Sequence, residues 1–507
     1  MKSPRGHGAA RGSNFAPRSK SFEGKFGRIF RTLPACEHDD AVLLKLALAM
    51  EAEREPDMNE DISDAEENQR IDAGFTYLGQ FIDHDLTFDP ASSFQKTNDP
   101  DAIVDFRTPR FDLDCVYGRG SDDQPYMYEA DGKHLKLGDP LTGNPKDLGT
   151  RDLPRSQPST DSRGNSIRRA IIGDPRNDEN VIVSQLQGTI IRFHNKVADF
   201  LLAQNAQTPF EEIQRVVRWH YQWVVLHDYL RVIAGKTIID TILPHLTSGK
   251  PIFEDGPQFR LYEPTKESFI PIEFSVAAYR FGHSMVRPFY RLNPTIKLPI
   301  FDPANPFGGL NAFNSFPSSW AIDWDLFFNP GGAPLVGADR IQKAYKIDTS
   351  LVNPLAHLPD SIAIDVKSLA LRNLKRGKSF GLPSGQTVAR FLGLQPIADS
   401  KLKVGKATVE DSANNETLVT IDTSFKDNAP LWYYILAEAQ QQFNGENSKG
   451  IKLGEIGGRI VAETFIGLLL GDSSSFISQF PNWKPESSFC RADGHFGMRE
   501  LINVAIR

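Results

Sequence analysis

The stretch YLGQFIDHDLTF, residues 77–88, places Asp83, His84 and Asp85 side by side in a segment that is otherwise rich in apolar residues. Burying such charged groups is costly unless each of them finds a partner. On a helix, Gln80 and His84 are four residues apart and point the same way, whereas Asp85 lies nearly on the opposite side. The stretch therefore predicts a helix that serves two sites at once, although a capped, partly exposed helix end would carry similar residues.

The rest of the sequence predicts a mostly α-helical protein with long loops and little β-structure. Helical periodicity recurs along the chain, and no run of alternating apolar and polar residues is sustained. The periodic segments are 41–54, 71–85, 181–202, 211–234, 273–290, 363–376 and 455–470. Pro-, Gly- and Asp-rich stretches over 89–170 and 291–360 are longer than ordinary loops, which indicates a functional role or wrapping over a core. Residues 1–25 lack an apolar period and are predicted to be disordered, so that the packed chain begins near Phe26.

The overall charge disfavours some classes of partner. The 507 residues include 57 Lys and Arg against 64 Asp and Glu, a formal net charge of -7, which gives no general attraction to nucleic acid or anionic lipid. Three cysteines, Cys36, Cys115 and Cys490, form no CxxC pair and are too few for a disulfide framework. No apolar stretch is long enough to predict a membrane span, and no apolar signal region follows the basic N-terminal residues. We expect a soluble protein that is cytoplasmic or is exported without a standard signal peptide.

The stretch TPRFDLDCVYG, residues 108–118, offers oxygen ligands at alternating positions. Thr108, Asp112 and Asp114 supply side-chain oxygens, and the carbonyl of Arg110 can add another. Hard oxygen ligands of this kind suit calcium, although the glycine and the terminal glutamate of an EF-hand are missing. A solvated acidic loop would show the same residues.

Two further segments carry candidate site residues. In GDPRNDEN, Asp174 is predicted to cap a helix that starts at Pro175, which puts Arg176 and Glu179 on one face near its start. In FSVAAYRFGHSMVRPFYRLN, residues 274–293, Arg280, His283 and Arg287 are spaced to share a face of an apolar helix, where the cations need an acidic partner. Taken alone, a histidine such as His283 is more often a hydrogen-bonded core residue than a ligand, and Asn373 in LALRNLKRGKSFGLPSG is ordinarily a polar helix residue.

Taken together in chain order, these motifs resemble the animal-type haem peroxidases of the peroxidase–cyclooxygenase superfamily. The resemblance runs over residues 70–475 and includes the late stretch LGEIGGRIVAETFIGLLLGD. It implies a single large helical domain over residues 26–507 that binds haem b and Ca²⁺.

The resemblance also implies a role for each motif residue. His84 matches the distal base, Arg176 its catalytic partner and Gln80 the glutamine that lines the halide pocket. His283 matches the proximal iron ligand, and Asn373 matches the acceptor of its N–H. The other matches are Asp83 and Glu179 to the carboxylates that form haem esters, Arg280 and Arg376 to the arginines that pair with the propionates, and Asp85, Thr108, Arg110, Asp112 and Asp114 to the calcium ligands.

The implied function is that of a haem peroxidase, an oxidoreductase that reduces hydrogen peroxide and oxidises small anions or phenolic and other aromatic donors. Asn180 stands where some relatives carry the methionine that forms a sulfonium bond to haem, so we expect iodide, thiocyanate or bromide to be preferred over chloride. One alternative is a fatty-acid dioxygenase of the same superfamily, but Arg280 occupies the place of its radical-forming tyrosine. Another is a haem-carrying adhesion protein without turnover, for which the distal residues His84 and Arg176 would be unnecessary.

Overall fold

The computed structural model describes residues 26–52, 55, 64–87, 105, 107–160, 164, 166–264, 268–302, 308–311, 313–334, 336–360, 362–441 and 450–507. The segment 1–25, predicted to be disordered, lies outside these residues. Buried apolar side chains from Phe26 to Ala505 belong to one hydrophobic cluster. All three cysteines are free.

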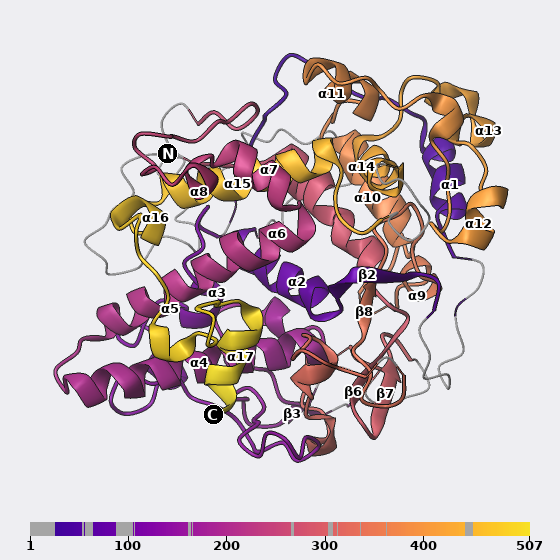
Figure 1. The fold of residues 1–507 in the computed structure, drawn as a ribbon. Coiled ribbons are helices and arrows are strands. Elements are labelled where there is room, and N and C mark those ends of the chain that lie inside the picture. Colours follow the sequence, from indigo (N-terminus) through magenta and orange to yellow (C-terminus); the bar gives the residue numbers. More distant parts are fainter. Residues whose placement is uncertain are drawn as a thin grey trace, which may run out of the picture.

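Helices make up most of the regular structure, as predicted (Figure 1). The α-helices are α1 (Asp40–Ala49), α2 (Gly74–Leu86), α3 (Asp114–Tyr117), α4 (Val181–Gln204), α5 (Phe210–Val224), α6 (Leu230–Ile233), α7 (Lys236–Ile242), α8 (His245–Ser248), α9 (Asn353–Ala356), α10 (Leu369–Ser379), α11 (Gly385–Phe391), α12 (Val409–Asn414), α13 (Leu418–Ile421), α14 (Leu431–Gln441), α15 (Glu455–Gly471), α16 (Phe476–Gln479) and α17 (Met498–Ile506). Within the described part of the chain, none of them combines the length and the apolar character needed to cross a membrane.

Shorter helical segments and strands connect these helices. The π-helical segments are η5 (Val225–Tyr229) and η6 (Glu273–Ala277), and the 3-10 segments are η3 (Pro125–Met127), η4 (Pro175–Asp178), η7 (Ala278–Met285), η8 (Ser318–Trp320), η9 (Trp324–Leu326), η10 (Asp399–Lys401), η11 (Thr423–Phe425) and η13 (Ser487–Phe489). The strands form two-stranded sheets: β1 (Phe26–Gly27) with β5 (Ile270–Pro271) in parallel, and three antiparallel pairs, β2 (Glu67–Asp72) with β8 (Lys343–Tyr345), β3 (Ser159–Thr160) with β4 (Ser166–Ile167), and β6 (Phe289–Asn293) with β7 (Ile296–Pro299).

The predicted helix over 273–290 is wrong beyond Met285. The segment is π-helical and then 3-10, and the chain is extended from Val286 into β6. Pro288 explains the end, because proline disfavours helical backbone in the residue before it. The acidic partner expected for Arg287 is present: its guanidinium lies 2.8 Å from the carboxylate of Glu67.

Other helix boundaries differ for local reasons. α10 begins at Leu369, not at 363, because the hydroxyl of Ser368 accepts the N–H of Leu371 as a cap. α1 ends at Ala49, and Glu51 then forms a β-bridge with Leu351. The sequence did not predict α14, in which every residue except Gln441 is buried, because a helix buried on all sides shows no polar face.

Helix α2 is the element that organises the site. Most of its residues are buried, and it packs against α4, η4, η5 and η7. Figure 1 shows α2 near the centre of the molecule. Residues 77–86 therefore belong to a core helix rather than to an exposed helix end.

Candidate active site

A cavity of about 550 Å³ lies between α2 and the η7 segment. Gln80, Asp83 and His84 line it from α2, and Arg280 and His283 line it from η7. Gln80 and His84 share a face of an α-helix because they are four residues apart. Arg280 and His283 share a face because a 3-10 helix has three residues per turn. Two histidines about 200 positions apart in the chain thus face one cavity of the size that ligands use.

An amide orients His84. The Nδ1 of His84 lies 2.7 Å from the Oδ1 of Asn177. The Nδ2 of Asn177 donates to the Oε1 of Gln187 at 2.9 Å, so the oxygen of Asn177 faces the imidazole and accepts its Nδ1–H. Burial and the charge of Arg176 lower the pKa of His84 to about 3. The imidazole is therefore neutral at pH 7, with its lone pair on Nε2.

Arg176 lies beside His84 but is not among the residues that line the cavity. Its Nη2 donates to the carbonyl of His84 at 3.0 Å and to the carboxylate of Asp174 at 2.7 Å. Asp174 also accepts the backbone N–H of Arg176 at 2.8 Å, which confirms the predicted cap before Pro175. This cap starts the short η4 rather than a long helix; α4 begins later, capped by Asn180.

Two carboxylates share the cavity with His84. Asp83 accepts a hydrogen bond from the hydroxyl of Thr87 at 3.1 Å. Glu179 accepts one from the amide of Gln80 and lies 3.7 Å from the Nε2 of His84. Burial raises the pKa of Asp83, and it raises the pKa of Glu179 to about 7. Both positions therefore disfavour the charged form of the carboxyl group.

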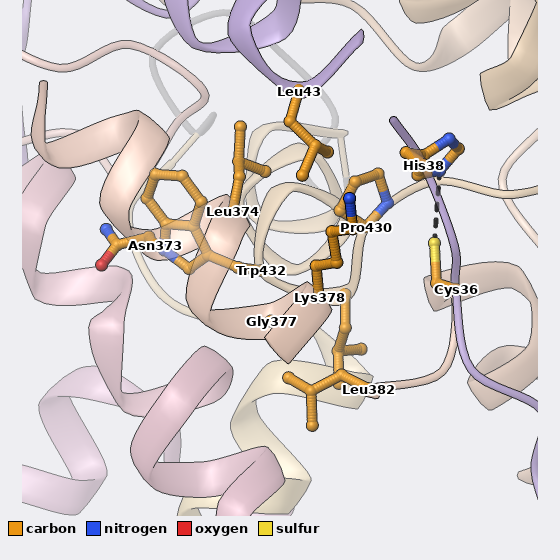
Figure 2. Close-up of a pocket in the computed structure, with 11 residues that line it drawn as sticks. Cys36, His38, Leu43, Asn373, Leu374, Gly377, Lys378, Leu382, Pro430 and Trp432 are labelled. Carbon is orange, nitrogen blue, oxygen red and sulfur yellow. Dashed lines mark hydrogen bonds between the residues drawn. The ribbon is translucent and has the colours of Figure 1, made fainter. Parts of the chain in front are cut away.

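His283 has a different kind of partner. Its Nδ1 lies 2.9 Å from the side-chain amide of Asn373 on α10. Burial and the charge of Arg280 lower the pKa of His283 to about 3, so this imidazole is also neutral. Asn373 also lines a second cavity of about 20 Å³, which is large enough for about one water molecule, together with Leu374 and Trp432 (Figure 2).

The two predicted propionate arginines differ in position. Arg280 lines the cavity, and its Nε donates to the carbonyl of Ser275 at 3.0 Å. Arg376 does not line the cavity, whereas Arg372 does. These two residues are four apart on α10 and so project to the same side of the helix, which leaves the sequence pattern unable to choose between them. Arg372 is a site residue that sequence reasoning missed.

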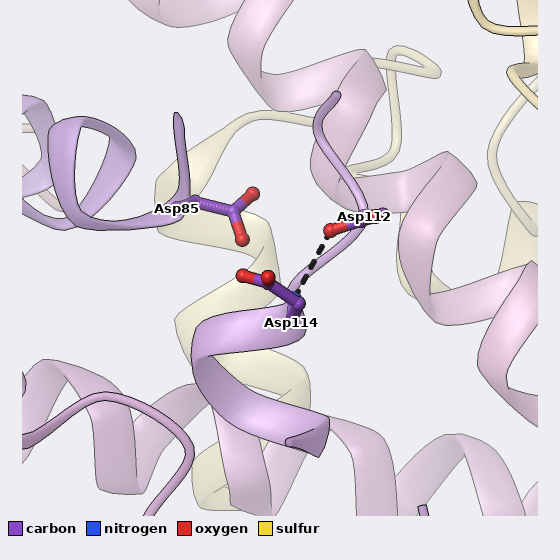
Figure 3. Close-up of side chains that lie close together, drawn as sticks. All are labelled: Asp85, Asp112 and Asp114. Atoms are coloured by element: carbon purple, nitrogen blue, oxygen red, sulfur yellow. Dashed lines mark hydrogen bonds between the residues drawn. The ribbon is translucent and has the colours of Figure 1, made fainter. Parts of the chain in front are cut away.

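The predicted acidic ligands come together beside α2. Oxygen atoms of Asp85, Asp112 and Asp114 all lie within 4.8 Å of one another (Figure 3). Asp85 is fully buried, and its Oδ1 has no hydrogen-bond partner in the described part of the chain. Burial and the charges of Asp112 and Asp114 raise the pKa of Asp85. Three carboxylates held this close are stable only if protons or a cation compensate their charge.

The remaining predicted ligands lie on the same loop as Asp112. The hydroxyl of Thr108 donates to the Oδ2 of Asp112 at 2.7 Å, which places it at the edge of the acidic group. The side chain of Arg110 points to Asp472, with a guanidinium nitrogen 3.6 Å from the carboxylate, so only its carbonyl is available as a ligand. The structure therefore supports a site built from α2 and this loop.

Sequence reasoning also missed the groups that hold these side chains in place. Asn177, Gln187 and Arg107 entered no motif argument, and Asp174 was considered only as a helix cap. The available signal was position, because Asn177 directly follows Arg176 in the GDPRNDEN stretch. Its partner His84 is 93 residues away in the chain, and local spacing says nothing about such a contact.

Known proteins share both sequence and fold with this chain. The animal haem peroxidase family matches residues 92–446. Peroxidasin of Drosophila melanogaster is 24% identical over 315 residues, which cover 61% of this chain and 18% of that protein. Thyroid peroxidase of Canis lupus familiaris is 28% identical over 281 residues, covering 53% of this chain and 26% of that protein. The chain thus spans about a quarter or less of the length of these relatives.

Two solved structures share the fold. Peroxidase A from Dictyostelium discoideum aligns with a TM-score of 0.58 at 18% identity and covers 94% of this chain and 93% of that chain. Fatty acid alpha-dioxygenase from Oryza sativa aligns with a TM-score of 0.53 at 14% identity and covers 98% of this chain and 84% of that chain. Identity at this level shows the fold alone. The family match includes Arg176, His283 and Asn373, and the structure brings His84 of α2 to the same site. This chain belongs to the animal haem peroxidase family.

Proposed function

We propose that this protein is a haem peroxidase that reduces hydrogen peroxide and oxidises small anions or phenolic donors. One observation carries the proposal: two neutral imidazoles, of His84 and His283, face one cavity, and the Nδ1 of each is held by an asparagine amide. We further propose that residues 26–507 form a single domain, because one hydrophobic cluster includes side chains from both ends of this range.

The residues present fit haem b. Haem needs a side-chain ligand for its iron, of which imidazole is one, apolar walls and cations for its propionates. With the amide oxygen of Asn373 turned toward Nδ1, the imidazole of His283 would keep its proton there, and the lone pair of Nε2 would be free to hold the iron. Arg280 and Arg372 line the cavity as cations, so we propose them for the propionates, with Arg376 as a second neighbour on α10. Apolar walls are supplied by Met285, Val286, Leu355 and Leu358.

When bound, the haem supplies the redox chemistry: it receives two oxidising equivalents from peroxide and passes them to donors. Peroxide reduction also needs a proton moved from one oxygen to the oxygen that leaves. We assign this transfer to His84, because its Nε2 has the lone pair and a neutral imidazole can take and return a proton. Asn177 keeps the other proton on Nδ1, so that Nε2 stays the acceptor.

Arg176 supplies a positive charge next to His84. Negative charge develops on the oxygen that leaves, and a preorganised cation nearby lowers the barrier. Loss of such a group typically costs about 3–4 kcal/mol in the barrier. Gln80 holds Glu179 by its amide, and we propose that it also lines the space where a small anion is oxidised.

We propose that Asp83 and Glu179 form ester links to haem methyl groups. Each C–O bond would replace a methyl C–H bond, a two-electron oxidation in which hydrogen peroxide is the oxidant and is reduced to water. Both carboxyl groups line the cavity, and burial raises the pKa of each. Esterification would remove two groups whose charged forms are costly to bury and would fix the haem in one orientation. Denaturing mass spectrometry of purified protein checks this, with haem that stays on the protein as the expected result; haem released completely by denaturation would contradict it.

We propose that Asp85, Asp112 and Asp114 bind Ca²⁺ together with the hydroxyl of Thr108 and the carbonyl of Arg110. The convergence of three carboxylates and the unpartnered Oδ1 of Asp85 fit a hard cation that takes six to eight oxygens. Asp85 directly follows His84 on α2, so the cation would hold the helix that carries the base.

For the donor we propose iodide, thiocyanate or bromide in preference to chloride. Asn180 lines the cavity, and no sulfonium bond to haem can form at this position. Stopped-flow reduction of the peroxide-oxidised protein by each anion tests the order. Chloride reacting as fast as bromide at neutral pH would refute it.

A second candidate is fatty-acid dioxygenase activity, which the fold shared with the Oryza sativa enzyme brings into consideration. Tyr279 lines the cavity, but its hydroxyl donates to the carbonyl of Gly79 at 3.1 Å and its neighbour Arg280 stands at the position of the dioxygenase tyrosine. We therefore expect no peroxide-independent oxygen uptake with linoleate.

The main test joins two measurements on one sample: the Soret absorption near 400 nm, and peroxide-dependent oxidation of guaiacol. The proposal expects both. A colourless protein after haem supplementation would refute haem binding, and a normal Soret band without turnover would favour a haem-carrying adhesion protein.

A further inference from the structure

Four charged side chains form a chain of contacts from the acidic cluster (Asp85, Asp112 and Asp114) to Arg176. A guanidinium nitrogen of Arg107 lies 3.2 Å from the Oδ1 of Asp114. The Nε of Arg107 donates to the Oδ2 of Asp174 at 3.0 Å, and its Nη2 donates to the same oxygen. Asp174 in turn accepts from the Nη2 of Arg176 at 2.7 Å. The signs of charge alternate along the chain, so each member is held by its neighbours.

The middle of this chain is shielded from solvent. The side chain of Arg107 is 8% exposed and that of Asp174 is fully buried. Buried charges interact strongly because little water screens them, and guanidinium groups hold carboxylates in a fixed geometry. A change of charge at Asp114 is therefore felt at Asp174 rather than being screened by solvent.

Asp174 accepts hydrogen bonds from two cations, so a stronger interaction with one of them weakens its interaction with the other. Both Arg107 and Arg176 donate to the Oδ2 of Asp174. A cation bound at Asp114 would weaken the attraction between the carboxylate of Asp114 and the guanidinium of Arg107. Arg107 would then pair more fully with Asp174, and Asp174 would hold Arg176 less strongly.

We infer that Arg107 and Asp174 are positioning residues that couple cation binding at the acidic cluster to the placement of Arg176. This inference rests on the proposed function, since it takes the cluster as a Ca²⁺ site and the cavity as a haem site. The coupling is separate from the covalent route along α2, in which Asp85 follows His84. With Ca²⁺ bound, a weaker ion pair with Asp174 lets Arg176 turn toward an anion in the cavity. Without Ca²⁺, the ion pair with Asp174 holds Arg176 away from the anion.

Azide binding to the haem-loaded protein tests the coupling, because azide is a small anion whose affinity rises with positive charge on the His84 side of the cavity. It is titrated by the shift of the Soret band, once with Ca²⁺ and once with a chelator. We expect about tenfold weaker azide binding without Ca²⁺, within the usual range for coupled sites. By reciprocity, isothermal titration should show that azide tightens Ca²⁺ binding by the same factor.

Two variants change the interaction between Asp174 and Arg176 in opposite directions. Arg107→Gln leaves Asp174 to Arg176 alone, so azide binding should be weak and should change less than about twofold on removal of Ca²⁺. Asp174→Asn keeps the shape but loses the charge that holds Arg176, so azide binding should be tight and equally insensitive to Ca²⁺. If one variant does not fold, the other still decides the question.

Arg155→Gln is the matched control. Arg155 is also a buried arginine between two aspartates, Asp152 at 2.6 Å and Asp178 at 2.9 Å, but it contacts neither Asp174 nor the acidic cluster. This variant should lose stability and keep the full Ca²⁺ effect on azide binding. The inference is overturned if Arg107→Gln or Asp174→Asn keeps the wild-type Ca²⁺ effect. A wild-type protein without a Soret band would instead refute the proposed function and the inference together.

Discussion

The two sides of the cavity hold their histidines in different ways. His84 belongs to a regular α-helix and is surrounded by charged groups, with Arg176 and Glu179 close by. His283 belongs to a 3-10 segment that follows a π-helical turn, and its partner Asn373 is uncharged. In the proposed function, the His84 side moves protons and stabilises charge, whereas the His283 side holds one nitrogen in a fixed place through an uncharged amide, with Arg280 and Arg372 as the cations that line the cavity there. The difference predicts that the same substitution has different consequences on the two sides.

The largest effect is expected from replacing the histidines themselves. His283→Ala should abolish normal iron coordination, seen as loss or displacement of the Soret band and loss of turnover. His84→Ala should keep the Soret band but slow the reaction with peroxide by about 10²–10⁴-fold, the usual contribution of a general acid–base group. Absorption spectra and stopped-flow kinetics of both variants check this. Equal spectra for the two variants would remove the distinction between the two sides.

Replacing the asparagine that contacts each histidine should separate the roles of the two sides of the cavity. Asn177→Ala leaves the Nδ1–H of His84 without its acceptor, so the peroxide reaction should slow by about 10–100-fold and its pH profile should shift. Asn373→Ala should leave the peroxide reaction less affected and should change the reduction potential instead, because Asn373 acts through His283. Spectroelectrochemistry and stopped-flow mixing separate the two outcomes. A shift in potential for Asn177→Ala, with no change in rate, would reverse these assignments.

Removal of Ca²⁺ should affect the His84 side more than the His283 side. The acidic cluster includes Asp85 on α2, so chelation should slow the peroxide reaction and lower the thermal unfolding temperature by roughly 1 °C per kcal/mol of binding energy lost. The iron coordination by His283 should remain, as judged by the Soret band. Asp85→Asn should show the chelated behaviour without a chelator. Unchanged kinetics after chelation would argue against a cation at this cluster.

The smallest effect concerns Glu179 in the haem-free protein. Its pKa is raised to about 7 by burial, above the ordinary value of 4.5, so the folded state binds more protons than the unfolded state between these pH values. The free energy of unfolding should therefore fall as the pH rises from about 4.5 to 7. Because 34% of the side chain is exposed, we expect a change of only about 1 kcal/mol.

The matched variant is Glu179→Gln, which should flatten this part of the stability profile relative to wild type. Urea unfolding at several pH values measures the difference between the two proteins. A wild-type profile that falls no more steeply with pH than that of the variant would show that Glu179 has an ordinary pKa.

Much of the site could be predicted from the sequence because its key residues lie in short, regular segments. Helix α2 has one periodicity from Gly74 to Leu86, so the sequence alone determined that Gln80 and His84 share a face and that Asp85 points elsewhere. The proposed calcium ligands Asp112 and Asp114 lie two residues apart, just before and at the start of α3, and their spacing was equally visible. The cap at Asp174 followed from local chemistry as well.

The tertiary structure decided what depends on distant contacts. Asn177 reaches His84 across 93 positions, and Arg107 reaches Asp174 across 67, distances at which local spacing carries no information. The backbone around His283 is π-helical and then 3-10, and the choice of Arg372 over Arg376 depends on how α10 packs against it. Periodicity reports which residues share a face, but packing alone determines which face meets which partner.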